Sequence, residues 1–330
     1  MKGYKAFGKG MVCLGFQYAE GKTFEHKGEI VLCSAGFHFC KNPLDVLNHY
    51  PLIDSRGDLS EFAEVKALGE TKTTGDKSVT NQLRIGAKLG LPEFIKAGYE
   101  AIWVKDTEIA EVNNEDKCQL DFFEDCSQSV TSREYAQLAN SENNVQVAAS
   151  GYGSQLASSG DDSRLATKGS NCYLASSGGY TQLATSGDYS RLAASGEDSR
   201  LTALGDNSRL AASGDNSKLM TTGNNVQLAA SGYRSYLASS GNDSRLATSG
   251  EDSQLATSGE DSQLATSGDY SRLTASGDIS RLAASGNNSQ FATSGNNVSL
   301  WAQQSTGNHG RRQSSGSIGR RQPTVSIGRR

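Results

Sequence analysis

Large apolar residues recur every nine positions through the second half of the chain. They stand at nineteen successive positions from Leu138 to Leu300, and only Val147 and Phe291 among them are not Leu. A Ser lies two residues before the apolar residue in most units, and a Gly lies five residues before it from Gly151 onwards. The unit reads Gly-x-x-Ser-x-Leu-Ala-x-Ser, without insertion or deletion. Self-similarity of this kind predicts a stacked repeat array.

Each nine-residue unit is expected to be a short strand followed by a tight corner. The spacing of nine matches neither a helical nor a heptad period. Residues two apart share one face of a strand, so Ser and Leu point to the same side and the residue between them points away. Gly followed by Asp or Asn is typical of turns, because Gly accepts positive φ and Asx side chains cap their own backbone. Stacked units of this type form a β-solenoid.

Two units per coil, or 18 residues, is the geometry that we expect, with nine to ten coils and a rod about 45 Å long at about 4.8 Å per coil. Small residues such as Ser154 and Ala157 are expected inside the coil, where they let the two sheets approach closely. The outward side chains form a candidate binding ladder of Arg164, Arg191, Arg200, Arg209, Tyr236, Arg245, Arg272 and Arg281.

Residues 1–110 have the texture of a small α+β domain. Strands are predicted at 4–7, 13–18, 22–26, 29–33, 37–40, 61–68 and 101–104. A short helix is predicted over 42–50, with Asn42 as its N-cap and Pro43 in its first turn. Residues 80–98 are predicted to be the longest helix, because Leu83, Ala87 and Leu91 follow an i, i+4 spacing.

The remaining boundaries follow from changes in composition. Residues 111–135 are predicted to be an acidic linker that ends in a cap, 136–303 the solenoid, and 304–330 a basic, disordered tail. In the tail, Gly310, Gly319 and Gly328 are each followed by two Arg, again nine apart. The period survives while the residues change, which suggests a frameshift within the repeat. The alternative is a tail that binds nucleic acid or acidic partners.

Composition limits the partners and the cellular compartments that we expect for the protein. The repeat explains the 35 % hydrophobic content and the 37 Gly among 330 residues. The net charge of −4 gives the protein no overall positive potential that would attract nucleic acid or an acidic membrane. No apolar run has the length of a signal peptide or a membrane span. Six Cys without the spacing of a disulfide framework predict a reduced, cytoplasmic setting.

Two resemblances concern the amino-terminal domain. The segments beginning at Lys2, Cys13 and Cys33, the last reading Cys-x-x-Gly-Phe-His-Phe-Cys-Lys-Asn-Pro, resemble an uncharacterised domain of bacterial and phage proteins that precedes Ser-Gly-Asp-Tyr-Ser-x-Leu-Ala-Ala repeats. That family implies no established activity. The order of a strand, a Gly-Phe-His-Phe segment and a helix is also similar to ADP-ribosyltransferase folds. That likeness makes His38 and Glu64 candidate catalytic residues, although no Arg or His pairs convincingly with a later Glu-x-Glu.

Metal and ice binding are further candidates. A candidate zinc site consists of Cys33, His38 and Cys40. The sequence contains no Cys-x-x-Cys pair, however, and buried free thiols beside a hydrogen-bonded His explain these residues better. The repeat resembles the paired units of ice-nucleation proteins without their Thr-x-Thr rows. The acids at its corners lack the Gly-Gly-x-Gly-x-Asp pattern of calcium-binding nonapeptides, so turn capping is the simpler interpretation.

The sequence therefore favours a non-enzymatic structural or interaction protein that uses a repetitive solenoid surface for multivalent binding or assembly. A protein partner or self-association is expected, without a cofactor and without a membrane. The alternatives are an ADP-ribosyltransferase-like effector with the solenoid as a spacer, and an ice- or metal-binding solenoid.

Overall fold

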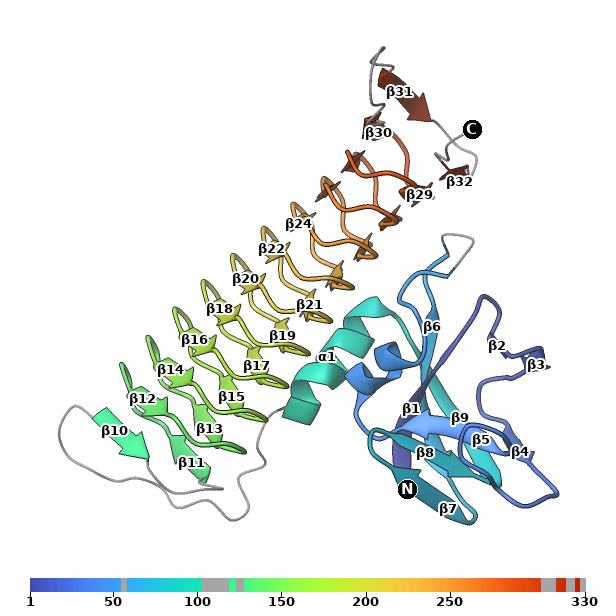
Figure 1. The fold of residues 1–330 in the computed structure, drawn as a ribbon, viewed down its shortest axis with the longest axis horizontal. Helices are drawn as coiled ribbons and strands as arrows, with labels where there is room; N and C mark the ends of the chain where they lie inside the picture. Colours follow the sequence, from blue (N-terminus) through green and yellow to red (C-terminus); the bar gives the residue numbers. More distant parts are fainter. Residues whose placement is uncertain (55–57, 103–118, 123–127, 304–312, 319–323, 327–330) are drawn as a thin grey trace. The chain divides into compact units, whose positions relative to one another are not determined.

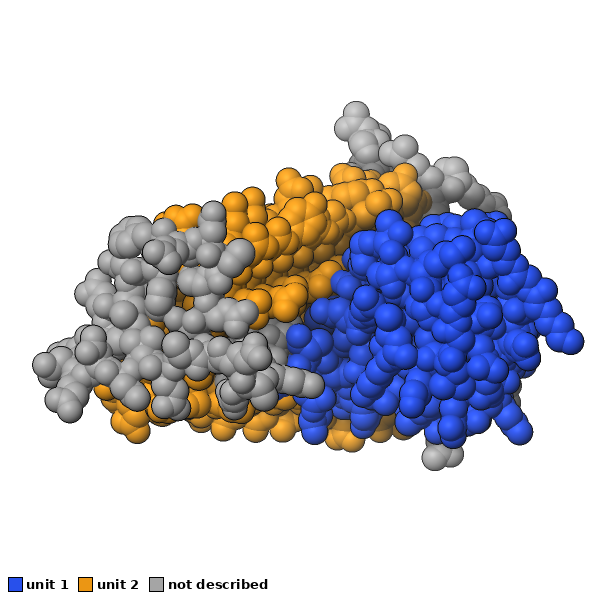
Figure 2. All heavy atoms as spheres, turned by 90° about the horizontal axis from the view of Figure 1, so that it is seen from below, with its two compact units in different colours: residues 1–101 blue, residues 102–330 orange. Residues whose placement is uncertain are grey.

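A computed structural model describes residues 1–330 except 55–57, 103–118, 123–127, 304–312, 319–323 and 327–330. The chain divides into two compact units, Met1–Ala101 and Ile102–Arg330 (Figure 2). The first unit is a small α+β domain, and the second is an all-β solenoid with 18 residues per coil. The predicted fold class is thus confirmed. The contact boundary after Ala101 lies nine residues before the predicted one.

The first unit is built on a seven-stranded sheet of order β4-β9-β6-β1-β5-β8-β7 (Figure 1). A separate two-stranded pairing joins β2 and β3, and the helices are the 3₁₀ helix η1 and the α-helix α1. The elements are β1 Lys2–Phe7, β2 Val12–Cys13, β3 Phe16–Gln17, β4 Thr23–Glu25, β5 Phe37–Cys40, η1 Pro43–Asn48, β6 Glu61–Ala67, β7 Thr71–Thr74, β8 Lys77–Thr80, β9 Gln82–Leu89 and α1 Leu91–Ile102.

The two faces of this sheet carry different cores, because alternate residues of each strand point to opposite sides. One face holds a cluster that includes Phe7, Phe39 and Val65. On the other face Phe62 of β6 stacks on Phe94 of α1, with ring centroids 3.9 Å apart. The helix η1 contacts β1 and β5, and Asn42 caps it by accepting a hydrogen bond from the Leu44 N–H at 2.9 Å. The predicted cap is confirmed.

The helix predicted over 80–98 is wrong in its first half, where the chain forms β9. Leu83 and Ile85 are fully buried on one side of this strand, while Arg84 between them and Ala87 beyond them are exposed. The apolar spacing satisfied a helical period and a strand period equally well, and pairing with β6 decided between them. The helix begins only at Leu91.

Three other predictions for this unit also change. The strand predicted over 13–18 is divided by a turn at Leu14 and Gly15 into β2 and β3. Residues 29–33 contribute only an isolated bridge from Val31 to Ala35 instead of a strand. Ile102 ends α1, whereas a strand was predicted over 101–104, of which residues 103 and 104 lie outside the described part. The hairpin of β7 and β8 was not predicted.

The solenoid consists of two sheets, named here the even and the odd sheet after the labels of the strands from β10 to β30; β31 joins the even sheet and β32 the odd sheet (Figure 1). The even sheet contains β10 Gln119–Phe122, β12 Gln137–Asn140, β14 Gln155–Ser158, β16 Tyr173–Ser176, β18 Arg191–Ala194, β20 Arg209–Ala212, β22 Gln227–Ala230, β24 Arg245–Thr248, β26 Gln263–Thr266, β28 Arg281–Ala284, β30 Val298–Gln303 and β31 Gln313–Ile318. The odd sheet contains β11 Gln128–Thr131, β13 Gln146–Ala149, β15 Arg164–Thr167, β17 Gln182–Thr185, β19 Arg200–Ala203, β21 Lys218–Thr221, β23 Tyr236–Ser239, β25 Gln254–Thr257, β27 Arg272–Ala275, β29 Gln290–Thr293 and β32 Thr324–Ser326.

Every parallel pairing in these sheets joins residues 18 positions apart. Leu210, for example, lies beside Leu192 in one neighbouring coil and beside Leu228 in the other. The Leu side chains of both sheets meet in one continuous core, in which Leu210 is 1 % exposed. Two nine-residue units therefore make one coil, as the sequence predicts.

The interior also contains rows of polar residues that are hydrogen-bonded. Where a Ser stands two residues before the Leu it is buried, and its hydroxyl donates to the carbonyl of the Gly three residues earlier, as from Ser217 Oγ to Gly214 O at 2.8 Å. Cys172 stands in the same row and donates to Gly169 O at 3.1 Å. These bonds allow small polar side chains to be buried without the cost of an unsatisfied donor.

The corner Gly is required by close packing between coils, and the positive φ falls two residues later. An ideal Cβ at Gly205 would lie 2.3 Å from the carbonyl oxygen of Gly187 in the preceding coil. Asn207, with φ 57°, is one of the residues that adopt the left-handed conformation. Asn and Asp tolerate this region better than other non-Gly residues, which explains their frequency at the third position of the unit.

The solenoid extends at both ends into segments that the sequence predicts to be a linker and a disordered tail. Strands β10 and β11 fall within the predicted linker 111–135, and Gln119 of β10 pairs with Gln137 in the same 18-residue register. Within the tail, for which the sequence predicts disorder, the described residues form β31 and β32, which pair antiparallel with β30 and β29. The Gly-Arg-Arg segments of the tail lie outside the described residues.

Candidate interaction surface

The outward face of the even sheet presents three parallel rows of side chains. In each coil the first and third strand residues and the residue after the strand point outward, as Gln155, Ala157 and Ser159 do, and all three are exposed. Ala157 was expected inside the coil, and the alternation that buries Leu156 instead turns it outward. The three rows run along the stack with a repeat of about 4.8 Å per coil.

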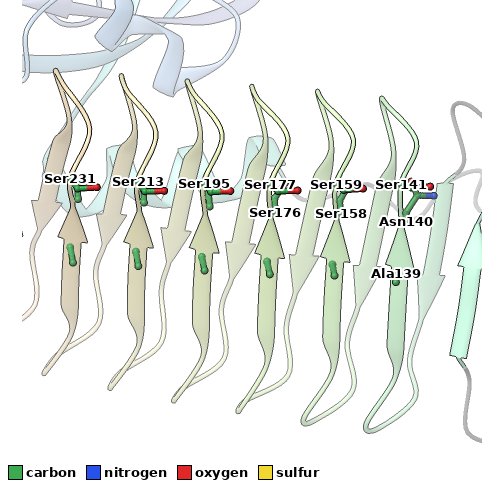
Figure 3. Close-up of a pocket in the computed structure, with 18 residues that line it drawn as sticks. Ala139, Asn140, Ser141, Ser158, Ser159, Ser176, Ser177, Ser195, Ser213 and Ser231 are labelled. Atoms are coloured by element: carbon green, nitrogen blue, oxygen red, sulfur yellow. The ribbon is translucent and has the colours of Figure 1, made fainter. Parts of the chain in front are cut away.

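The Ala row is the floor of a groove, named here the alanine groove. Its floor is formed by Ala139, Ala157, Ala175, Ala193, Ala211, Ala229, Ala247, Ala265 and Ala283, and one side is lined by the Ser residues two positions further on, from Ser141 to Ser285. Figure 3 shows the Ser residues of successive coils in a single row. The groove is shallow and open to solvent, with a volume of about 1040 Å³ from β12 to β22 and about 600 Å³ from β22 to β30, where Trp301 occupies the Ala position.

Longer side chains, named here the ridge, border the groove on its other side. The ridge consists of Gln137, Gln155, Tyr173, Arg191, Arg209, Gln227, Arg245, Gln263 and Arg281, all exposed. The Arg191 guanidinium lies 5.2 Å from the centre of the Tyr173 ring, so adjacent members of the ridge pack on one another. The ridge carries four Arg and no acid.

The predicted binding ladder is divided between the two sheets. Arg191, Arg209, Arg245 and Arg281 belong to the ridge of the even sheet, whereas Arg164, Arg200, Tyr236 and Arg272 occupy the equivalent position of the odd sheet. Because successive units alternate between sheets, a nine-residue period in the sequence becomes two separate rows with an 18-residue period.

The outward rows of the odd sheet are less regular than those of the even sheet. At the position equivalent to the Ala row, the odd sheet has Thr202, Met220 and Thr274. At the position equivalent to the Ser row, it has Lys168 and Leu204. Both sheets derive from the same repeat, so the uniformity of the even sheet is not a consequence of the repeat alone.

Acidic corner residues connect successive coils. The carboxylate of Asp206 accepts a hydrogen bond from the Asn224 N–H at 2.7 Å, while the N–H of Asp206 donates to Asp188 Oδ1 at 2.8 Å. At Asp278, the backbone and side-chain N–H groups of Asn296 hold the carboxyl pKa below its usual value. The corners that follow the Ser row contain nine acids, named here the acidic rim: Glu142, Asp161, Asp162, Glu197, Asp198, Asp215, Glu251, Asp252 and Asp269.

The candidate catalytic residues of the first unit are not brought together. His38 lies in β5 and Glu64 in β6, on either side of β1, so two strand spacings of about 4.8 Å each separate their backbones. His38 Nε2 accepts a hydrogen bond from the Cys33 N–H at 2.8 Å, and Glu64 forms an ion pair with Lys2 at 2.8 Å. Burial, then the nearby charges of Lys5 and Lys77, lower the pKa of His38.

The candidate zinc ligands are not arranged as a metal site. Among the described residues, no three His, Cys, Asp or Glu side chains converge on one point. Cys40 is buried, and burial raises the pKa of its thiol to about 12, so it is protonated and a poor ligand. Cys33 is exposed and contacts Lys77 Nζ at 3.5 Å. The expectation of buried thiols beside a hydrogen-bonded His is therefore confirmed for Cys40 and His38 but wrong for Cys33.

Comparison with known proteins finds one family model that matches the amino-terminal unit. A family model described as Domain of unknown function (DUF7666) matches residues 1–97, which agrees with the expected uncharacterised amino-terminal domain. Neither the curated proteins nor the solved structures contain a match to the chain. Within the part that the structure describes, no helix is long and apolar enough to cross a membrane.

The groove and its Trp were not recognised from the sequence. The signal was present, because Ala follows Leu at every second unit from Ala139 to Ala283 without exception, while intervening units vary. Reading the rows separately requires the 18-residue coil, which the sequence predicts and the paired strands confirm.

Proposed function

We propose that the protein is a non-enzymatic structural or interaction protein whose even-sheet face binds a macromolecular partner through many equivalent contacts. One observation carries this proposal: exposed Ala and Ser repeat without variation from β12 to β28 of the even sheet, whereas the equivalent positions of the odd sheet vary. Exposed positions seldom need one residue type for stability. A repeated partner contact explains why these positions do not vary.

The affinity of a repeated surface increases with the number of equivalent contacts that it makes. Each coil presents the same small contact, and once one contact forms, its neighbours bind at high effective concentration. The expected partner is therefore extended or itself repetitive. The cytoplasmic setting, the bacterial or phage source and the basic tail's binding of nucleic acid stay predictions.

The test places a photoreactive amino acid at Ala211, in the floor of the groove, in the full-length chain within its own cells. Ultraviolet light is expected to yield a discrete cross-linked product that contains the protein. A matched variant carries the same amino acid at Leu14 of the first unit, which is 97 % exposed. Products of the same mass and yield from both positions, or none from Ala211, would contradict the proposal.

The enzyme alternative is tested by titrating NAD into the full-length protein in a calorimeter. We expect no saturable heat, because His38 and Glu64 are engaged with other partners and separated by β1. Saturable binding that is lost in Glu64→Ala would instead favour a transferase relative. Lys2→Ala serves as the control, since it breaks the same ion pair but leaves the carboxylate in place.

A further inference from the structure

The alanine groove and the ridge have complementary shapes, and both belong to one chain. We infer that the partner of the even-sheet face is a second copy of this chain, in a parallel two-fold dimer whose axis runs along the solenoid. In this arrangement the ridge of each copy lies in the alanine groove of the other. The inference rests on the proposed function and names its partner.

The symmetry follows from the order of the rows. In each coil a long ridge residue precedes the groove Ala by two positions, as Arg209 precedes Ala211. A two-fold axis along the rod, midway between the two rows, places Arg209 of one copy opposite Ala211 of the other, and the reverse. Facing sheets pack about 10 Å apart, so one long and one short side chain fill the space at every coil.

The last coil provides a second observation, because there a small residue lies at the ridge position and a large residue at the Ala position. Strand β30 pairs with β28 so that Ser299 continues the ridge and Trp301 continues the Ala row. Trp301 is 48 % exposed and closes the end of the groove. In the parallel, in-register dimer, Trp301 of one copy faces the small Ser299 of the other. The pairing of one large with one small residue is thereby preserved where the rows change.

The antiparallel alternative is unfavourable. A two-fold axis along the strands would place ridge on ridge and groove on groove. Arg residues of the two copies would then meet at close range, and like charges opposed across an interface cost several kcal/mol. The Ala rows would also leave an unfilled gap between the copies. The parallel axis avoids both problems.

Charge supports the same arrangement. Beyond the alanine groove come the Ser row and then the acidic rim, as Ser195 is followed by Gly196 and Glu197. An Arg of the partner's ridge lies along the Ala floor with its aliphatic stem, and its guanidinium extends towards the hydroxyls and carboxylates of the rim. These charges lie at the edge of the interface, so added salt weakens the dimer moderately.

The area is sufficient for a specific dimer. Nine strands from β12 to β28, spaced by about 4.8 Å, and five residues of about 3.3 Å across give about 700 Å² per copy. Standard interfaces bury about 800 Å² per partner. The Trp301 pair adds further apolar area at one end.

The experiment is sedimentation equilibrium of the full-length chain under reducing conditions, since Cys33 is exposed. A reversible dimer is expected. Ala229→Gln places two long side chains opposite each other, once on each side of the axis, and should weaken dimerisation at least tenfold. The double variant Gln227→Ala with Ala229→Gln exchanges the sizes within one coil and should restore it. Unchanged circular dichroism and melting establish that each variant folds.

The outcomes separate the two proposals. A wild-type chain that stays monomeric up to about 100 µM overturns the dimer, as does a dimer that the double variant fails to restore. If the monomeric chain still gives a cross-link from Ala211 to another macromolecule, the proposed function stands while this inference fails. A monomeric chain without any cross-link overturns both.

Discussion

The two units of this protein are stabilised by contacts of opposite kinds. In the amino-terminal unit, strand pairing joins residues that are distant and unlike, as Tyr4 of β1 lies between Cys40 and Glu64. In the solenoid each residue lies beside its own equivalent 18 positions away, as Leu210 lies beside Leu228. The first unit should therefore unfold as a whole, while the stability of the solenoid is approximately a sum over coils and their interfaces.

The largest expected effect comes from a Cβ placed between coils. Gly205→Ala would bring its Cβ against the carbonyl of Gly187, and no backbone atom can move away without separating the coils. We expect a loss of about 4 kcal/mol, with fast hydrogen exchange confined to coils near residue 205.

The matched change in the first unit is Gly75→Ala. Gly75 has φ +59°, but nothing lies within 4 Å of its Cβ position, so the cost is about 1 kcal/mol of backbone strain. If the two Gly variants lost equal stability, close packing between coils would not be the reason for the corner Gly.

Removal of a core side chain separates additive from cooperative unfolding. Leu210→Ala is expected to cost about 3 kcal/mol, and Phe94→Ala about 4 kcal/mol, since both side chains are buried. Hydrogen exchange should accelerate only in neighbouring coils for Leu210→Ala, but throughout residues 1–101 for Phe94→Ala. A solenoid whose distant coils exchange faster in the Leu variant would contradict the additive description.

A smaller effect is expected for the corner hydrogen bonds. Asp206→Ala removes the acceptor of the Asn224 N–H and should cost about 1 kcal/mol in denaturant unfolding. Asp206→Asn keeps an acceptor oxygen, as Asn224 itself does for Asn242, and should retain most of the stability. Equal losses in both variants would show that the charge matters more than the hydrogen bond.

The smallest effect is a pH dependence at Asp278. Because hydrogen bonds from Asn296 lower its pKa in the folded state, its contribution to stability is present above the ordinary value of 3.8 and is lost as pH falls through the lower folded value. Melting temperatures of the wild type and Asp278→Asn, compared between pH 6 and pH 2, should show the wild type losing its relative advantage in acid. A difference that does not change with pH would contradict this assignment.

Much of the solenoid was predictable, because its contacts repeat those within the sequence. The period of nine, the buried Leu row and the 18-residue coil all follow from residue spacing, and the structure confirms them. The candidate surface was only partly predictable. The outward Arg residues and the two-sheet coil were predicted, but the uniform Ala and Ser rows of one sheet were not recognised, because their members lie 18 positions apart.

The sequence by itself determined the repeat and the burial of Ser and Leu on one side of each strand, since both depend on residues fewer than ten positions apart. Packing between coils, over 18 positions, decided why the corner requires Gly. Tertiary structure alone decided whether residues 82–89 form a helix or a strand, because Leu83 and Ile85 suit both and pairing with β6 selects one. It also decided that β1 lies between the strands that carry His38 and Glu64. The alanine groove exists for the same reason, as stacking brings together Ala residues that are 18 positions apart in the chain and have no contact before the coils form.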